Sequence, residues 1–465
     1  MAAVRGASNA GGDPPRPSLE VTVGRLLELA GGADVAAAEV YGERSLSRRI
    51  KVYQGGVEQL TEARRTGVGL RVVRNGSVGY AYSSDTGQTA LTQLVDRAVA
   101  YASVTQPDEH VALPLPQGNA VKDLVLWDDN LNRVSQAEKI EMAVRCERAA
   151  LDRDPRVKLV EDTIYVDEDA EVVVASTTGV GGSYRVNYCY LFLYVLAEQD
   201  GGVETGVAYD VGRDPARLDP QACGREAAER ACRLLGARPC PSFKGTVVLE
   251  PFTAASVLGV LGSALTADAV QKGRSLFASL EGQAVAAELL DLADDGIHPE
   301  GLASAPFDGE GVPCRRTPII SGGTLQGFLY DTYTAHKAGR TSTGNGGRGS
   351  YQSAPSVRPT NLVLEGRTTP VDGIVGAIER GVLVTDVVGV HSGANAVSGE
   401  FSVGISGILI ENGRLGRPLR EVTLAGDIPS MLRGVVALGD DARWVPSGSV
   451  LTPSVAIEGM SIAGS

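Results

Sequence analysis

The segment that decides how the second half of this chain folds reads Lys244-Gly245-Thr246-Val247-Val248-Leu249-Glu250-Pro251, followed by Phe252 to Ala267. Its first residues have the apolar, β-branched composition of a short buried strand. Pro251 stands where proline is favoured, at the first position of a helix. Apolar and small residues then continue without a break, and the first ionisable side chain is Asp268. The pattern predicts a strand, a turn and a buried helix.

The predicted helix lacks side chains that bind transition metals. A zinc-binding helix carries two nitrogen or sulfur donors about one turn apart, usually beside a carboxylate. The corresponding face of this helix offers only serine, valine, glycine and leucine, none of which can hold zinc. We therefore expect no metal on this helix. The residues of that face are Ser256, Val257, Gly259, Val260 and Leu261.

Composition and charge indicate an ordinary globular protein of two or three domains. The 465 residues carry a formal net charge of −13, and single cores stop growing near 250–300 residues. Because Lys and Arg form no cluster, we expect binding neither to nucleic acid nor to a membrane. The six scattered cysteines are typical of free thiols in a reducing compartment. With no signal-peptide pattern and no 18-residue apolar run, a cytoplasmic location is expected.

The order of predicted elements indicates an α+β fold in four segments. Residues 1–17 form a Gly/Ala/Pro/Arg tail that is expected to be disordered. Residues 18–125 predict an N-terminal domain, in which helices cover antiparallel strands. Residues 126–241 predict a central α+β domain with a second run of strands. Residues 242–465 predict a strand-rich, Gly-rich C-terminal domain.

Alternating apolar and polar residues predict the N-terminal strands. Asn75-Gly76 is the strongest hairpin signal, because both turn positions require positive φ. In the central domain, Ser135 and Glu138 predict a capping box that opens a helix. The N-terminal strands are expected at 36–41, 49–53, 57–63, 68–73 and 78–82, with further turns at Gly55-Gly56 and Thr66-Gly67.

The chain has four histidines, so few residues can act as an imidazole base or ligand. His110 and His298 lie in proline-flanked connecting segments, where a solvated or structural role is expected. His336 on a short predicted helix and His391 in a glycine-flanked loop are candidates for a base or ligand role, since such loops often carry function. No two histidines are spaced to pair on one helix, and no phosphate-binding loop or Gly-x-Ser-x-Gly elbow is present.

A Gly-rich segment from Thr343 to Gly349 is a further candidate. Its backbone N–H groups can surround an anion as a nest, or the segment can be a flexible turn between a helix and a strand. The candidate binding residues are Thr343, Gly344, Asn345, Gly346 and Arg348.

Carboxylates near other glycines offer no clear acid–base pair. Asp308 and Glu310 belong to Phe-Asp-Gly-Glu-Gly, and Glu400 and Glu411 lie near predicted strand ends. We expect all four to be solvated turn residues.

Several short motifs occur in the order of one known family. Leu329-Tyr330-Asp331 leads to Thr343-Gly344-Asn345-Gly346, and Ser398-Gly399-Glu400-Phe401-Ser402 leads to Ile410-Glu411-Asn412-Gly413. On these residues the chain resembles the TldD/PmbA family, also described as modulators of DNA gyrase. Segments that match more loosely are Val57-Glu58, Gly67-Val68-Gly69-Leu70-Arg71-Val72 and the ending from Pro453 to Gly464.

The resemblance implies a cytoplasmic peptidase assembly of two kinds of subunit. The TldD type carries a His-Glu-x-x-x-His zinc motif and a later Cys, and the metal-free PmbA (TldE) type pairs with it around a cavity for unfolded peptide. Here Ser256 stands at the first His, Val257 at the Glu and Leu261 at the second His. Pro446-Ser447-Gly448-Ser449 stands where the Cys is expected. The resemblance thus implies a PmbA/TldE-type chain that binds no cofactor, with zinc on a TldD-type partner.

Three functions remain open. The first is a non-catalytic subunit of a zinc-dependent TldD/TldE-type metallopeptidase heterodimer, which contributes to the peptide cavity and is inactive alone. Here the loop from Thr343 to Gly349 and nearby strand edges would pair with extended peptide. The second is an independent metal-free enzyme or peptide-maturation protein that uses His336, His391 or a serine. The third is a non-enzymatic regulator of another protein.

Overall fold

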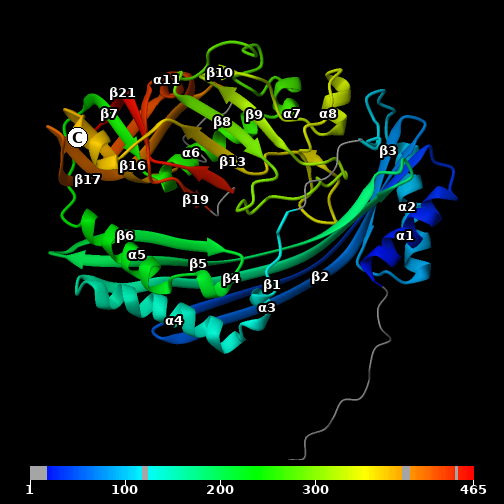
Figure 1. Cartoon of the computed structure of the whole chain (residues 1–465), viewed down its shortest axis with the longest axis horizontal. Coiled ribbons are helices and arrows are strands. Elements are labelled where there is room, and N and C mark those ends of the chain that lie inside the picture. Colours follow the sequence, from blue (N-terminus) through cyan, green and yellow to red (C-terminus); the bar gives the residue numbers. More distant parts are fainter. Residues whose placement is uncertain (1–17, 118–123, 390–397, 446–448, 465) are drawn as a thin grey trace, which may run out of the picture.

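A six-stranded antiparallel sheet runs through the first half of the chain (Figure 1). The computed structural model describes residues 18–117, 124–389, 398–445 and 449–464; the predicted tail 1–17 and His391 lie outside them. The strand order is β3-β2-β1-β4-β5-β6, and the four central strands are each 17 to 20 residues long. The strands are β1 (Ala37–Tyr53), β2 (Gly56–Arg74), β3 (Ser77–Ser83), β4 (Val157–Ser176), β5 (Gly181–Gln199) and β6 (Gly202–Gly212).

The predicted turn at Thr66-Gly67 is wrong, because β2 continues through it and pairs Gly67 with Glu43 of β1. The glycine is needed for another reason. A Cβ at this position would lie 2.3 Å from the ring of Tyr351, which reaches the strand from the second half of the chain. The predicted Asn75-Gly76 turn is confirmed, with φ angles of 51° and 77°.

β1 and β4 join the two parts of the chain that were predicted as N-terminal and central domains. Their antiparallel pairing extends over most of both strands, so one sheet is shared by the two parts. Helices cover one face of this sheet (Figure 1). At one end lie α1 (Leu19–Gly31) and α2 (Gln88–Val104), and at the other end lie α3 (Asn130–Arg133), α4 (Gln136–Arg153) and α5 (Pro220–Leu234).

Local signals in the sequence explain how these helices begin and how closely they pack. The Ser135–Glu138 capping box at the start of α4 is confirmed. Glycines on the strands allow the helices to approach: a Cβ at Gly79 would lie 1.9 Å from the carbonyl oxygen of Ala98 in α2. A Cβ at Gly206 would likewise lie 2.2 Å from a carbonyl oxygen of α5. The absence of a side chain at these positions permits contact between strand and helix backbones.

The C-terminal part packs two sheets around the helix α6 (Pro251–Ala264). One sheet has the order β14-β18-β21-β17-β16-β15-β7, and the other has the order β10-β9-β8-β13-β20-β19. The first contains β7 (Phe243–Leu249), β14 (Thr368–Thr369), β15 (Arg380–Val388), β16 (Glu400–Glu411), β17 (Arg414–Asp427), β18 (Val435–Gly439) and β21 (Val455–Ala463). The second contains β8 (Leu290–Asp295), β9 (Arg316–Ser321), β10 (Thr324–Leu325), β13 (Leu362–Gly366), β19 (Arg443–Val445) and β20 (Val450–Thr452).

The predicted strand, turn and buried helix at the start of this part are confirmed. β7 leads into α6 with Pro251 at the first helical position. The helix ends at Ala264, three residues before the predicted end, and Thr266 caps a separate short helix. Short elements complete the part: α7 (Ala267–Gln271), α8 (Thr332–Lys337), β11 (Gly346–Gly347), β12 (Ser356–Val357), α9 (Val371–Gly376) and α11 (Ile428–Arg433).

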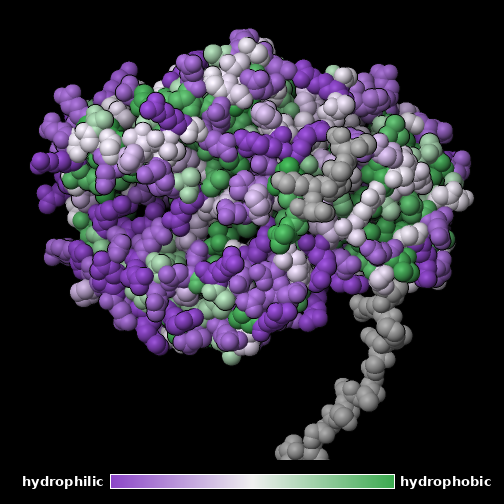
Figure 2. All heavy atoms as spheres, in the orientation of Figure 1, coloured by the Kyte–Doolittle hydropathy of each residue, from purple (hydrophilic) through white to green (hydrophobic). Residues whose placement is uncertain are grey.

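The mixed architecture confirms the predicted α+β class. No helix among the described residues is long and apolar enough to cross a membrane. Hydrophilic side chains cover most of the face shown in Figure 2, and the surface is hollowed between the long sheet and the C-terminal sheets.

Candidate functional site

The face of α6 that was compared with a zinc helix lies partly in the apolar core, with Leu261 buried, Ser256, Val257 and Val260 half-buried and Gly259 exposed. Leu261 is 2% exposed, and Val257 lines a small cavity whose other walls are entirely apolar, including Phe401 and Met431. The Ser256 hydroxyl donates to the carbonyl of Phe252, 3.1 Å away. Zinc requires imidazole, thiolate or carboxylate ligands, so these residues do not fit the metal. In the described part of the chain, no group of three or more His, Cys, Asp and Glu residues could hold a metal ion.

Two of the histidines meet in space although they are far apart in sequence. The rings of His110 and His336 lie 6.1 Å apart at 89°, and Nδ1 of His336 lies 2.9 Å from the carbonyl oxygen of His110. Beside them, the Tyr333 hydroxyl donates to Asp108 at 2.8 Å. The connecting segment thus docks on α8. His298 lies elsewhere, with its ring 5.0 Å from that of Trp444.

The Gly-rich loop from Thr343 to Gly349 uses many of its polar groups within the chain. Gly346 N–H donates to Asp308 at 2.7 Å, and the Asn345 amide donates to Asp294 at 2.6 Å. Thr343 Oγ1 donates to the Asn345 side chain and also accepts from the backbone N–H of Tyr330. Gly344, Asn345 and Gly346 of the loop are buried, and its strand β11 pairs with β12 in a short two-stranded sheet.

The expectation that Asp308 and Glu310 are solvated is wrong. They are 7% and 1% exposed, because they lie where the long sheet meets the C-terminal part. Arg71 of β2 bonds to Glu39 of β1 at 2.5 Å and to Glu310 at 2.9 Å. Arg348 from the Gly-rich loop contacts the other oxygen of Glu39. These four residues, Arg71, Glu39, Glu310 and Arg348, form the junction network, in which two cations balance two carboxylates.

Burial raises the pKa of three carboxyl groups around the junction network. Burial, with the nearby Glu310 charge, raises the pKa of Asp308 well above its usual range, although three backbone N–H groups bond to it. Burial and the Glu310 charge also raise the pKa of Asp331. Burial raises the pKa of Asp294 to about 6. Desolvation disfavours the charged form in each case.

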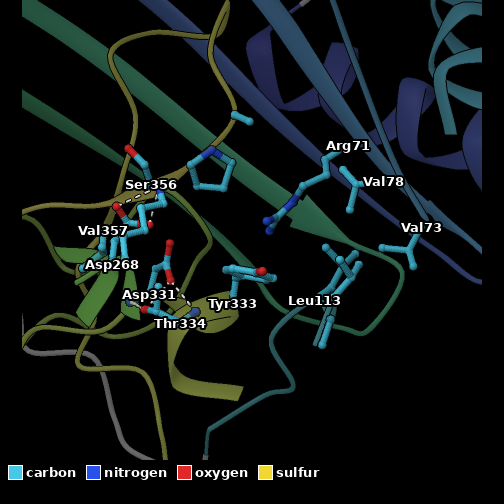
Figure 3. A pocket seen from close by; sticks show the side chains of 15 residues that line it. Arg71, Val73, Val78, Leu113, Asp268, Asp331, Tyr333, Thr334, Ser356 and Val357 are labelled. Atoms are coloured by element: carbon cyan, nitrogen blue, oxygen red, sulfur yellow. Dashed lines mark hydrogen bonds and ion pairs between the residues drawn. The ribbon is translucent and has the colours of Figure 1, made fainter. Parts of the chain in front are cut away.

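A pocket of about 470 Å³ opens beside the junction network (Figure 3). It lies between the β2–β3 end of the long sheet and the α7–α8 region. Figure 3 shows the Arg71 guanidinium directed into this space, toward Asp331 and Tyr333. The Nε atom of Arg71 is buried and has no hydrogen-bond partner among the described residues. The pocket is mixed in character, since Val73, Val78 and Leu113 form its apolar wall.

A larger cleft of about 860 Å³ separates β4, β5 and β6 from the C-terminal part. We call it the sheet cleft. Its sheet wall carries Tyr188, Tyr190, Phe192 and Tyr209, and its other wall includes Phe252 at the start of α6 and Arg358. Charged residues of the lining are Arg49, Asp162 and Arg358.

The sequence analysis missed Glu39, Arg71 and Arg358 as residues of interest. Glu39 and Arg71 interrupt strongly apolar strand segments, and a charge at such a position was the signal that a buried partner exists. Arg358 carries no comparable signal, because its position beside the cleft depends on how two distant parts of the chain meet.

The fold thus defines a class of protein with a long shared sheet, a two-sheet C-terminal part and a cleft between them. Models for domain 1, the central domain and the C-terminal domain of PmbA/TldA metallopeptidases match residues 38–102, 129–235 and 242–464. The chain is 30% identical to the metalloprotease PmbA of Escherichia coli O157:H7, over 96% of this chain and 97% of the relative. It belongs to the PmbA/TldD metallopeptidase family, as its motifs predicted.

Solved structures agree with this assignment. A candidate DNA gyrase modulator from Thermotoga maritima is 27% identical, with a TM-score of 0.88, and the match covers 96% of this chain and all of that one. TldE from Thermococcus kodakarensis is 22% identical with a TM-score of 0.88, covering 95% of this chain and all of that one. At 22% identity, the likeness to TldE supports the fold alone.

Proposed function

We propose that this chain is the metal-free, PmbA/TldE-type subunit of a two-chain zinc peptidase, in which a TldD-type partner supplies the metal. One observation carries the proposal: where a zinc helix would present ligands, α6 presents Ser256, Val257 and Leu261, which are a hydroxyl bonded within its own helix and two apolar side chains. Hydrolysis would then depend on the companion chain. The contribution of this chain is to bind and orient the peptide.

The sheet cleft supports a binding role. It is concave and large enough for several side chains, with aromatic walls and few charged groups, which is typical of ligand sites. An extended peptide lying between the long sheet and the C-terminal part would contact both walls. The Gly-rich loop, proposed at first as a direct peptide contact, adjoins Arg358 of the cleft lining, because Gly347 leaves the space that the Arg358 side chain fills.

Co-expression with a TldD-type relative that carries the His-Glu-x-x-x-His motif tests this function. We expect the two chains to co-purify, zinc to be present in stoichiometric amount with the pair, and an unfolded peptide to be cleaved only by the pair. A partner with both motif histidines changed to Ala is the matched control, and it should still co-purify but lose zinc and cleavage.

Two results would contradict the proposal. If this chain alone cleaved peptides, it would be an independent enzyme. The activity of His336→Ala would then show whether His336, which contacts His110, takes part in the reaction. If the two chains did not associate, and the chain bound another protein without any cleavage, a regulatory role would be favoured.

A further inference from the structure

The sheet wall of the sheet cleft is an aromatic ladder. Tyr188, Tyr190 and Phe192 alternate along β5 and therefore lie on one face of the sheet, because side chains of a strand repeat every second residue. Cys189, Leu191 and Leu193 point to the opposite face and pack under α4 and α5. The ladder continues onto β6 at Tyr209, whose ring lies 5.9 Å from that of Phe252 across the cleft.

The charges of the sheet cleft are unbalanced. Its lining contains two guanidinium groups, Arg49 from β1 and Arg358 from the C-terminal part, and neither forms an ion pair with any described residue. The carboxylate of the lining, Asp162, is bound to Lys51 at 2.8 Å, and Lys51 also binds Glu58 at 2.9 Å. The lining therefore has two cations and one carboxylate, and a further carboxylate, Glu168, accepts a hydrogen bond from Tyr188 at 2.9 Å.

Arg358 is partly buried and lacks the counter-ion that such a position normally requires. Burial lowers the pKa of its guanidinium, which reflects the cost of removing a charge from water without a partner. Arg71 and Arg348, also removed from solvent, are both bound to carboxylates in the junction network. A ligand carboxylate would give Arg358 an equivalent partner.

The position of Arg358 is set by the Gly-rich loop. A Cβ at Gly347 would lie 2.4 Å from Arg358 Nε and 2.5 Å from its Cδ, so the side chain lies directly over the glycine. Gly347 pairs with Ser356 in the β11–β12 sheet, two residues before Arg358. The loop thus holds the guanidinium at the cleft without bonding to it.

A second polar group without a partner belongs to a residue of the cleft lining. The Tyr209 side chain is 6% exposed and lines the sheet cleft, and its hydroxyl has no hydrogen-bond partner among the described residues. A buried hydroxyl without a partner is unfavourable.

We infer, building on the proposed function, that the sheet cleft selects an acidic extended peptide. Asp or Glu side chains of the peptide would pair with Arg358 and Arg49, and its aromatic or apolar residues would pack on Tyr188, Tyr190 and Phe192. Single-stranded nucleic acid is disfavoured, because two guanidinium groups offer little to a polyphosphate and the rest of the chain is acidic.

Binding of short fluorescein-labelled peptides tests the inference by anisotropy, with the full chain and with the co-purified pair. One peptide alternates Asp with Tyr and Ala, and the matched peptide has Asn in place of Asp. We expect the acidic peptide to bind about tenfold more tightly, as one charge-assisted hydrogen bond allows. The preference should decrease as salt concentration rises.

Three variants separate the role of Arg358 from general effects. Arg358→Gln should reduce affinity for the acidic peptide about tenfold and leave the Asn peptide unchanged. Gly347→Ala should have the same direction of effect, since it displaces the guanidinium but keeps its charge. Arg340→Gln, which removes an exposed arginine paired with Glu281, is the control and should change neither affinity. Urea unfolding midpoints establish that each variant is folded.

The possible outcomes decide between the two proposals. Equal affinities for both peptides, or an unchanged acidic affinity in Arg358→Gln, would overturn the acidic preference, while zinc-dependent cleavage by the pair would leave the proposed function intact. If the chain preferred the acidic peptide but did not associate with a TldD-type partner, the acidic preference would stand and the proposed function would be overturned. Tighter, Arg358-dependent binding of a fluorescein-labelled oligothymidylate would replace the peptide with nucleic acid.

Discussion

At the scale of single residues, burial decides what the acidic groups of this protein do. Asp294 on β8 is 1% exposed and accepts hydrogen bonds from Asn345 and from both the N–H and the hydroxyl of Thr360. These bonds favour its charged form, but desolvation exceeds them and raises its pKa to about 6. The residue therefore links protonation to the attachment of the Gly-rich loop.

The raised pKa of Asp294 predicts that the free energy of unfolding decreases as pH rises. Its folded pKa of about 6 lies above the unfolded value of 3.8, so between these values the folded chain holds a proton that the unfolded chain has released. The free energy of unfolding that depends on this proton is fully present below pH 4 and is lost as pH rises through 6. It amounts to about 3 kcal/mol. Urea unfolding of the native chain and Asp294→Asn from pH 4 to pH 7 measures it. Parallel curves for the two proteins would contradict the assignment.

At the scale of secondary-structure elements, close contact between backbones fixes how helices lie on the long sheet. α2 rests on β3 where Gly79 leaves room for the backbone of Ala98 and Ala102. The contact uses rigid main-chain atoms on both sides, so it cannot adapt to a side chain by a change of rotamer. Packing of this kind explains why glycine occurs within strands, where its propensity is poor.

Two glycine substitutions should shift stability in opposite directions. Gly79→Ala places Cβ 1.9 Å from Ala98 O and 2.6 Å from Ala102 N, and overpacking of this kind lowers the free energy of unfolding by about 1–3 kcal/mol. Gly24→Ala, inside α1 with no atom within 4 Å of the new Cβ, should raise it by about 1 kcal/mol. Urea denaturation measures both. The packing account fails if Gly79→Ala is as stable as the native chain.

At the scale of the whole molecule, the long sheet and the C-terminal part are joined by buried charges as well as by apolar contacts. Arg71 and Glu39 belong to the sheet, and Glu310 and Arg348 belong to the C-terminal part. A second set joins the other end, where Arg230 and Arg233 of α5 bind Glu250 just before α6.

Removing Arg71 should weaken this attachment. Arg71→Met leaves Glu310 buried without a cation and Glu39 with Arg348 alone, and breaking a buried pair in this way costs about 3–5 kcal/mol. Arg340→Met removes an exposed arginine from Glu281 and should cost at most about 1 kcal/mol. Urea unfolding gives both values, and limited proteolysis should cut Arg71→Met faster between the two parts. Equal losses in the two variants would mean that the junction network does not stabilise the fold.

Local patterns in the sequence were enough for the elements whose causes are local. The capping box at Ser135, the hairpin at Asn75-Gly76 and the proline start of α6 all depend on residues a few positions apart, and the structure confirms them. The same patterns misplaced Thr66-Gly67 as a turn. Glycine is required there because the ring of Tyr351, nearly 300 positions later in the chain, leaves no room for a Cβ. No local pattern can reveal such a contact.

The sequence by itself determined the α+β class, the family and the absence of zinc ligands at Ser256, Val257 and Leu261, because composition, motif order and ligand chemistry can be recognised in the chain without coordinates. Only the tertiary structure decided that Asp308 and Glu310 are buried, that Arg71 is paired with Glu39, and that Arg358 lies unpaired beside an aromatic cleft. The physical reason is that desolvation and pairing depend on which distant segments meet, and the folded chain alone specifies that.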